Sequence, residues 1–177
     1  MEQNPQVKTT PAIAHLREKN IIFTECPFAY VDKGGTAHSS HALGVAEHAV
    51  IKTLIFEKTE ASKTAASGTL KTPCQSHCVV LMHGDLNVDT KKLALAVGSR
   101  RAFPCEPMKA CELTGYQLGG TSPFGLKTAL PVFAEASIQN LDQLWINGGA
   151  RGLLVRITPH DLVRAIPLEW VNVGKSR

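Results

Sequence analysis

Short apolar stretches alternate with segments of helical spacing along most of the chain. The clearest strand is predicted over 50–56, where VIKTLIF is β-branched and mostly apolar. Other short strands are expected over 21–24, 78–82, 101–103, 130–134, 144–146, 152–157 and 170–173. Helices are expected over 11–19, 39–43, 90–97, 106–113 and 159–165. This uneven interleaving predicts an α+β fold, a single domain with a mixed, curved β-sheet and surrounding short helices.

One segment interrupts this pattern. Residues 58–77 lack large apolar side chains and are rich in Ser, Thr, Ala and Lys, so we expect a flexible insertion between two strands of a hairpin. Residues 1–9 are polar and are expected to form a disordered lead-in. The remaining range, 10–173, is predicted to be one domain, as the length of 177 residues suggests.

Composition narrows the class of protein. A hydrophobic content of 44% with 19% charged residues is typical of a globular chain with a real core. There is no apolar run near 18 residues and no apolar signal core near the start, so we expect no membrane partner. Five cysteines, an odd number, indicate reduced thiols in a cytoplasmic protein. The net charge of +4 is scattered, which permits an anionic partner but does not favour DNA.

A glycine loop, defined here as residues 119–125 (GGTSPFG), concentrates three glycines, a proline and two hydroxyls in seven residues. Glycine allows close approach to backbone N–H groups, so the loop can present these groups and the Ser122 hydroxyl to a carbonyl oxygen or an oxyanion. A tight surface turn between two elements is the alternative interpretation.

Lys52 is an unusual residue for its position, because it is a charged side chain inside the clearest predicted strand, which is otherwise mostly apolar. Strand alternation puts its side chain on the same face as Val50, Leu54 and Phe56. One interpretation is a partly buried ammonium in a cleft, which holds an ester, a phosphate or an amino-acid group, or acts as a base if its pKa falls. The other is a lysine on an edge strand whose ammonium reaches solvent.

Other catalytic signatures are missing from the sequence. It has no G-x-S-x-G elbow, P-loop or dinucleotide fingerprint, and its seven histidines form no H-E-x-x-H pattern. Cys74 and Cys78, with His77 and His83 nearby, are the candidate zinc ligands, but they lack a second close cysteine pair. We therefore predict no metal and no cofactor, and keep a zinc-supported or structural protein as an alternative.

Three stretches in combination resemble the YbaK-like aminoacyl-tRNA deacylases, relatives of the editing domain inserted in bacterial prolyl-tRNA synthetases. They are Thr10-Pro11-Ala12 at the first helix, Ile51-Lys52-Thr53-Leu54 on the strand, and 114–125 (TGYQLGGTSPFG). The stretch 147–153 (NGGARGL) resembles that family's second glycine turn. The likeness extends from about residue 10 to residue 171.

The resemblance implies a trans-editing hydrolase that removes a wrongly attached amino acid from tRNA. The partners it implies are the acceptor CCA end of the tRNA and, as a candidate, prolyl-tRNA synthetase. Lys52 matches the essential lysine of the family, and Thr53 lies beside it. The implied substrate-binding residues are Gly119, Gly120, Thr121, Ser122, Pro123, Phe124 and Gly125, with Phe28 and Tyr30 as flanking aromatics and Gly148 and Gly149 as the second turn.

In such a family no protein side chain attacks the ester; the substrate's own thiol, the ribose 2′-hydroxyl or water does. We expect Lys52 to bind or orient the substrate, and the N–H groups of Gly120 to Phe124 to hold the ester carbonyl. Thr121 and Phe124 replace the Ile and Leu of the Cys-selective form, which leaves Cys on tRNA(Pro), Ala or another small amino acid open. A non-catalytic module that binds an aminoacyl ligand, a nucleotide or a synthetase is the alternative.

Overall fold

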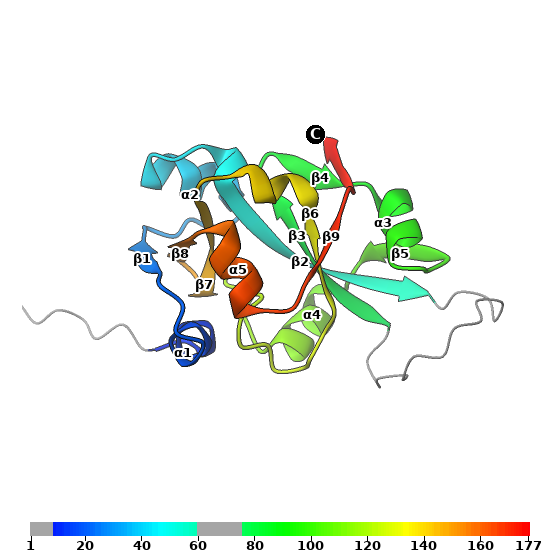
Figure 1. Ribbon diagram of the computed structural model, residues 1–177, viewed down its shortest axis with the longest axis horizontal. Helices are drawn as coiled ribbons and strands as arrows, with labels where there is room; N and C mark the ends of the chain where they lie inside the picture. The colour runs from blue at the N-terminus through cyan, green and yellow to red at the C-terminus, as the bar shows by residue number, and fades with distance from the viewer. Residues whose placement is uncertain (1–8, 60–75) are drawn as a thin grey trace, which may run out of the picture.

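The computed structural model describes residues 9–59 and 76–177 (Figure 1). Most of the predicted lead-in (1–9) and of the predicted insertion (58–77) lies outside these ranges. At both ends of the insertion the flanking strands extend further than predicted, to Thr59 on one side and from His77 on the other. No helix among the described residues is long and apolar enough to cross a membrane.

The described residues form a mixed eight-stranded sheet in the order β1-β8-β7-β2-β3-β6-β9, with β5 also paired to β2. The pairs β2–β7, β3–β6 and β6–β9 are parallel and the other pairs are antiparallel. The predicted α+β class with a mixed sheet is therefore confirmed. The strands are β1 (Thr24–Pro27), β2 (Val50–Thr59), β3 (His77–His83), β5 (Arg101–Pro104), β6 (Val132–Glu135), β7 (Leu144–Ala150), β8 (Leu153–Ile157) and β9 (Glu169–Val171).

The helices are short and start where the sequence predicts in four of five cases. The hydroxyl of Thr10, the carboxylate of Asp89 and the hydroxyl of Thr158 each accept a hydrogen bond from a first-turn N–H group, as N-caps do. The helices are α1 (Pro11–Glu18), α2 (Gly35–Leu43), α3 (Thr90–Ala96), α4 (Pro107–Thr114) and α5 (Pro159–Ala165), with 3₁₀ turns η1 (Glu47–Ala49) and η2 (Ala136–Asn140).

Both faces of the sheet are covered, so the core has two layers. Ile51 and Ile55 of β2 belong to the layer under α1, α4 and α5, whereas Phe56 belongs to the layer under α3 (Figure 1). The central strand β3 is buried along its whole length, which explains its continuous apolar run.

Three further differences from the predicted elements affect the start of the chain, α2 and the C-terminal end. The first strand is 24–27 rather than 21–24, because Ile21 turns into the core after α1 while Ile22 is 84% exposed. Helix α2 begins at Gly35, four residues before the predicted Ser39 start. A further strand, β10 (Gly174–Ser176), pairs with β4 (Leu86–Val88), so the ordered chain continues beyond the predicted end at residue 173.

Candidate active site

The site begins with a gap in the pairing of β2. On one edge β2 pairs with β3 from Ile51 to Glu57, but on the other edge β7 reaches only Val50 and Ile51, and β5 starts at Phe56. The stretch between them faces no strand of the described residues on that edge. Ile55 directs its carbonyl there and accepts from the N–H of Cys105 at 2.9 Å. Since every second residue of a strand presents its polar groups to the same edge, Thr53 directs its N–H and C=O into the gap.

A cleft of about 580 Å³ opens at this gap. It collects side chains from the segment after β1, from α2, from β2, from the glycine loop and from the β7–β8 connection. Six residues of the predicted set line it: Phe28, Tyr30, Lys52, Thr53, Gly119 and Thr121. The fold thus brings together positions that lie more than ninety residues apart in sequence.

Lys52 lies in the cleft with its ammonium held at a defined point. Its Nζ donates a hydrogen bond to the backbone carbonyl of Leu86 at the start of β4. Burial lowers the pKa of Lys52, and the nearby guanidinium of Arg177 lowers it further, while Glu47 and Asp85 act in the opposite direction. An ammonium carries three donors, so two remain for a ligand.

The pKa of Lys52 is expected to rise in an Arg177→Gln variant. Arg177 donates to Glu47 at 2.8 Å, so the substitution removes a neighbouring positive charge and also leaves the Glu47 carboxylate unpaired beside Lys52. Both changes favour the protonated lysine, so its deprotonation moves to higher pH. NMR titration of the lysine ε-carbons will measure this shift, with Arg164→Gln as the distant control. A Lys52 titration that stays in place in Arg177→Gln contradicts the coupling.

The glycine loop divides into a cleft part and a buried part. Gly119 and Thr121 face the cleft, whereas Ser122, Pro123 and Phe124 are buried. The Gly120 N–H is already bonded to the Gln117 carbonyl at 2.9 Å. The Phe124 N–H is bonded to the Ser122 hydroxyl at 3.3 Å. The expectation that N–H groups throughout 120–124 hold a ligand carbonyl is therefore corrected: within the described chain, Thr121 is the residue of that run whose N–H is unpaired beside the cleft.

Phe124 does not shape the cleft, contrary to the sequence-based expectation. Its ring is fully buried and stacks on His15 of α1 with centroids 6.2 Å apart. The Tyr116 hydroxyl donates to the Phe124 carbonyl at 2.6 Å. Gly125 adopts φ +61°, and a Cβ there would lie 2.5 Å from the carbonyl oxygen of Pro11. The buried half of the loop thus anchors it on α1, which positions Gly119 and Thr121.

Gly148 and Gly149 do not form a turn; they lie inside β7, where the pairing with β8 shifts register between Asn147 and Ala150. Gly149 has φ +91° and packs on Tyr116 and α1, which leaves no room for a Cβ. The bulge directs Asn147 toward the glycine loop, where its Nδ2 donates to the Gly119 carbonyl at 3.0 Å. The predicted second turn is thus a β-bulge that supports the loop.

Two groups of cleft residues were missed from sequence. Arg151, in the β7–β8 turn, donates from Nε to the Leu118 carbonyl at 2.8 Å and lies over the Tyr30 ring at 5.1 Å. In α2, His38 bonds the Ala29 carbonyl at 2.7 Å and packs against Phe28, so this helix holds the aromatic segment in place. Helix α2 has weak apolar periodicity, and only Gly44, a left-handed C-cap, marked its end.

The zinc alternative finds little support among the described residues. His83 uses both ring nitrogens, with the His48 carbonyl at 2.6 Å and the Ser137 hydroxyl at 2.9 Å. Burial raises the pKa of Cys78 to about 11, which disfavours the thiolate that a metal requires. Cys74 lies outside the described ranges, and within them no three His, Cys, Asp or Glu side chains gather as a metal site.

Comparison with known proteins gives matches named for the editing of aminoacyl-tRNA and for prolyl-tRNA synthetase. A family model described as "Aminoacyl-tRNA editing domain" matches residues 35–165. "Putative Cys-tRNA(Pro)/Cys-tRNA(Cys) deacylase EbsC" of Enterococcus faecalis is 24% identical over 164 residues, 92% of each chain. "Proline--tRNA ligase" of Brachyspira hyodysenteriae is 27% identical over 149 residues, which are 77% of this chain and 26% of the ligase. The crystal structure of "a putative trans-editing enzyme for prolyl tRNA synthetase" superposes with a TM-score of 0.75 at 20% identity, covering 99% of this chain and 100% of that one.

These matches define the class of protein. The model match covers well over half of the chain, and the structural match shows the same fold. The chain belongs to the aminoacyl-tRNA editing domain family, which confirms the resemblance found in the sequence.

Proposed function

We propose that this protein is a cytoplasmic trans-editing hydrolase that deacylates mischarged tRNA, with Cys or another small amino acid on tRNA(Pro) as the substrate. The observation that carries the proposal is the cleft itself: in a chain of the editing family, Lys52, Thr53 and Thr121 converge on an unpaired strand edge. The relatives named for Cys-tRNA(Pro) and for prolyl-tRNA synthetase support the choice of tRNA and suggest the synthetase as a partner.

The chemistry needs positioning more than a protein nucleophile, because an aminoacyl ester of a ribose is already activated. Ser39, the serine on the cleft, donates its hydroxyl to the Thr36 carbonyl, and Ser122 is buried. No hydroxyl or thiol of the described cleft is hydrogen-bonded to a histidine ring. Attack therefore comes from water or the substrate's thiol. Attack by the neighbouring ribose 2′-hydroxyl would move the amino acid to the 2′-oxygen, and water would then have to release it from there.

The protein stabilises the charge that this attack creates. The oxygen of water or the sulfur of the substrate's thiol bonds to the ester carbon, the carbonyl electrons move onto oxygen, and the nucleophile's proton passes to solvent water in the cleft. The N–H groups of Thr53 and Thr121 and the Lys52 ammonium are donors available to the oxyanion. When the tetrahedral intermediate collapses, the bond to the ribose 3′-oxygen breaks and that oxygen takes up a proton. The hydrogen bond to the Leu86 carbonyl already holds the Lys52 ammonium in position, so the side chain needs little rearrangement during this step.

The cleft is expected to select a small amino acid. With Phe124 buried elsewhere, Thr121, Leu118 and Leu54 are among the residues that line the cleft with Thr53. A pocket of this kind separates substrates that differ by one methylene by about 10–200-fold in kcat/KM. Purified protein should be assayed on tRNA(Pro) charged with Cys, Ala, Ser or Pro, and one small amino acid should be removed preferentially.

The same panel should be run on two threonine variants. Thr121→Val keeps the shape of a cleft side chain but removes its hydroxyl, and Thr128→Val is the matched control outside the cleft. Turnover that is equal on all four esters contradicts size selection. Binding of charged tRNA with no release of any amino acid would identify a non-catalytic module instead.

A further inference from the structure

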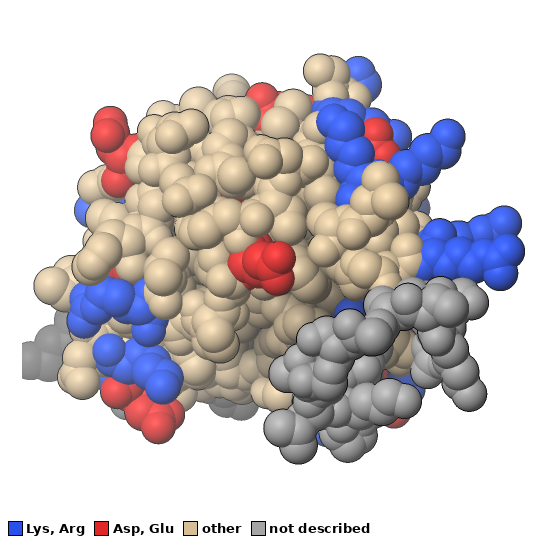
Figure 2. All heavy atoms as spheres, turned by 45° about the vertical axis from the view of Figure 1, so that its right-hand side comes forward, with Lys and Arg blue, Asp and Glu red and all other residues tan. Residues whose placement is uncertain are grey.

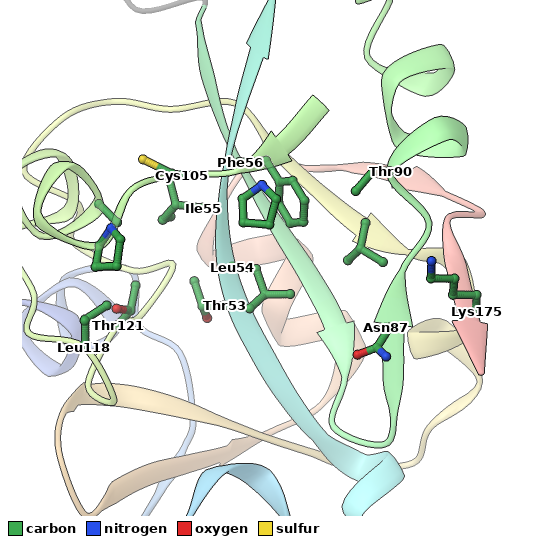
Figure 3. A pocket seen from close by; sticks show the side chains of 14 residues that line it. Thr53, Leu54, Ile55, Phe56, Asn87, Thr90, Cys105, Leu118, Thr121 and Lys175 are labelled. Atoms are coloured by element: carbon green, nitrogen blue, oxygen red, sulfur yellow. The ribbon is translucent and has the colours of Figure 1, made fainter. Parts of the chain in front are cut away.

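A second pocket of about 490 Å³ adjoins the cleft (Figure 3). The two share a wall made of Thr53, Leu54, Leu118 and Thr121. Beyond this wall the second pocket runs over the outer part of β2 toward β4, the start of α3 and β10 (Figure 3). A ligand whose reacting end lies at Thr53 can therefore place its other end in the second pocket.

The second pocket has apolar walls and a polar end. Leu54, Pro104 and Pro107 supply flat apolar surface. At the opposite end Asn87 of β4 and Lys175 of β10 are directly paired across the two strands, so their side chains lie on the same face (Figure 3). Both residues are exposed, and neither side chain has a hydrogen-bond partner among the described residues. A hydrogen bond from the Lys92 N–H lowers the pKa of the Asp89 carboxyl, and the positive charge of the nearby Lys175 lowers it further. The pocket thus offers apolar contact, an amide and an ammonium to one ligand.

A basic surface continues from this polar end. Lys91 and Lys92 follow Thr90, which lines the pocket, and both are exposed on α3. Arg100, just before β5, and Arg101, its first residue, are exposed as well. Figure 2 shows basic side chains gathered at the right of the view, whereas the middle is mostly uncharged around an acidic group. Exposed cations that lie close together in this way suit an anionic chain.

We propose that the second pocket binds the terminal adenosine of the tRNA acceptor and that the basic surface carries the phosphates that precede it. This inference rests on the proposed function and adds the direction in which the tRNA enters. A purine has two apolar faces for the pocket walls, and asparagine forms a bidentate hydrogen bond with the N6 and N7 edge of adenine. The ammonium of Lys175 then meets the adjoining phosphate.

The opposite arrangement, with the amino acid in the second pocket, fits less well. Volume does not separate the two arrangements, because both cavities, of about 490 and 580 Å³, exceed the side chain of Cys or Ala. Charge does separate them: the opposite arrangement would send the nucleotide to the cleft side of the shared wall, away from Lys91, Lys92 and Lys175. Charge complementarity therefore assigns the nucleotide to the second pocket.

The first test measures base recognition with RNA hairpins that end in single-stranded CCA or CCC and carry no amino acid. Fluorescence anisotropy should show that the wild type binds the CCA hairpin about tenfold more tightly, as expected for one bidentate base contact. Asn87→Ala should bind both hairpins alike. Asn140→Ala, which alters an exposed asparagine on η2, should retain the preference.

The second test separates phosphate contacts from base contacts. For the CCA hairpin, the slope of log K against log salt concentration should fall by about one in Lys175→Ala and in Lys91→Ala. Asn87→Ala should keep the wild-type slope, because an amide releases no counterion. Lys19→Ala, at the exposed C-terminal end of α1, should also keep it.

The outcomes distinguish this inference from the proposed function. Base preference that depends on Asn87 supports the adenosine site even if no charged tRNA is hydrolysed. Equal binding of CCA and CCC, or a preference that survives Asn87→Ala but disappears in Tyr30→Ala, overturns it even if deacylation is rapid. Salt slopes that are unchanged in Lys175→Ala and Lys91→Ala overturn the phosphate path.

Discussion

Replacing Lys52 with alanine is expected to lower kcat/KM for deacylation by about 10²–10³-fold, the usual loss when one pre-positioned donor to an oxyanion is removed. The ammonium lies in the cleft and is fixed by its hydrogen bond to the Leu86 carbonyl. Water that replaces it lacks the charge and the fixed position. The rate should be measured on aminoacyl-tRNA under single-turnover conditions, with uncatalysed hydrolysis subtracted.

The fold should survive this substitution. Lys52 is only partly buried, and water from the open cleft can satisfy the Leu86 carbonyl once the lysine is gone. We expect Tm to change by less than about 4 °C, corresponding to roughly 1 kcal/mol for a chain of this size. Lys58→Ala is the matched control, since Lys58 lies on the same face of β2 but outside the cleft. A Lys52→Ala protein with wild-type turnover would falsify the catalytic assignment.

A Gly125→Ala substitution is expected to destabilise the protein by about 2–4 kcal/mol. Gly125 adopts φ +61°, which is unfavourable for alanine, and the new Cβ would meet the Pro11 carbonyl oxygen at 2.5 Å. That oxygen belongs to the first turn of α1, so relief requires the loop and the helix to separate. Chemical denaturation with circular dichroism will measure the loss, and activity should fall with it because the loop positions Gly119 and Thr121.

Gly98→Ala provides the matched comparison. Gly98 has the same φ of +61°, but nothing lies within 4 Å of a Cβ at that position. Gly98→Ala should therefore destabilise the protein only through the left-handed backbone conformation, by about 1–2 kcal/mol. If the two variants lose the same stability, the close packing of the glycine loop on α1 contributes nothing beyond its backbone conformation.

Local sequence determined the parts of the fold that depend on neighbouring residues. The strand predicted over 50–56 is the first part of β2, and the helices predicted from residues 11, 90 and 159 begin there, each after a side-chain N-cap. The helix predicted over 106–113 ends one residue later, before the left-handed Gly115. These features are governed by β-propensity, by a side chain that accepts from the first helical turn, and by a left-handed glycine. Each of these causes acts within a few residues, so it can be read without knowing the rest of the structure.

Only the tertiary structure decided what surrounds Lys52 and the glycine loop. Phe124 is buried because α1 presents His15 to it, and Gly148–Gly149 bulges because Tyr116 and α1 occupy the space a turn would need. The cleft exists because β7 and β5 leave part of β2 unpaired, a consequence of strands that are far apart in sequence. The sequence therefore identified residues capable of the chemistry. Long-range packing determined which of these residues lie together in the cleft, because contacts between distant segments leave no local sequence pattern.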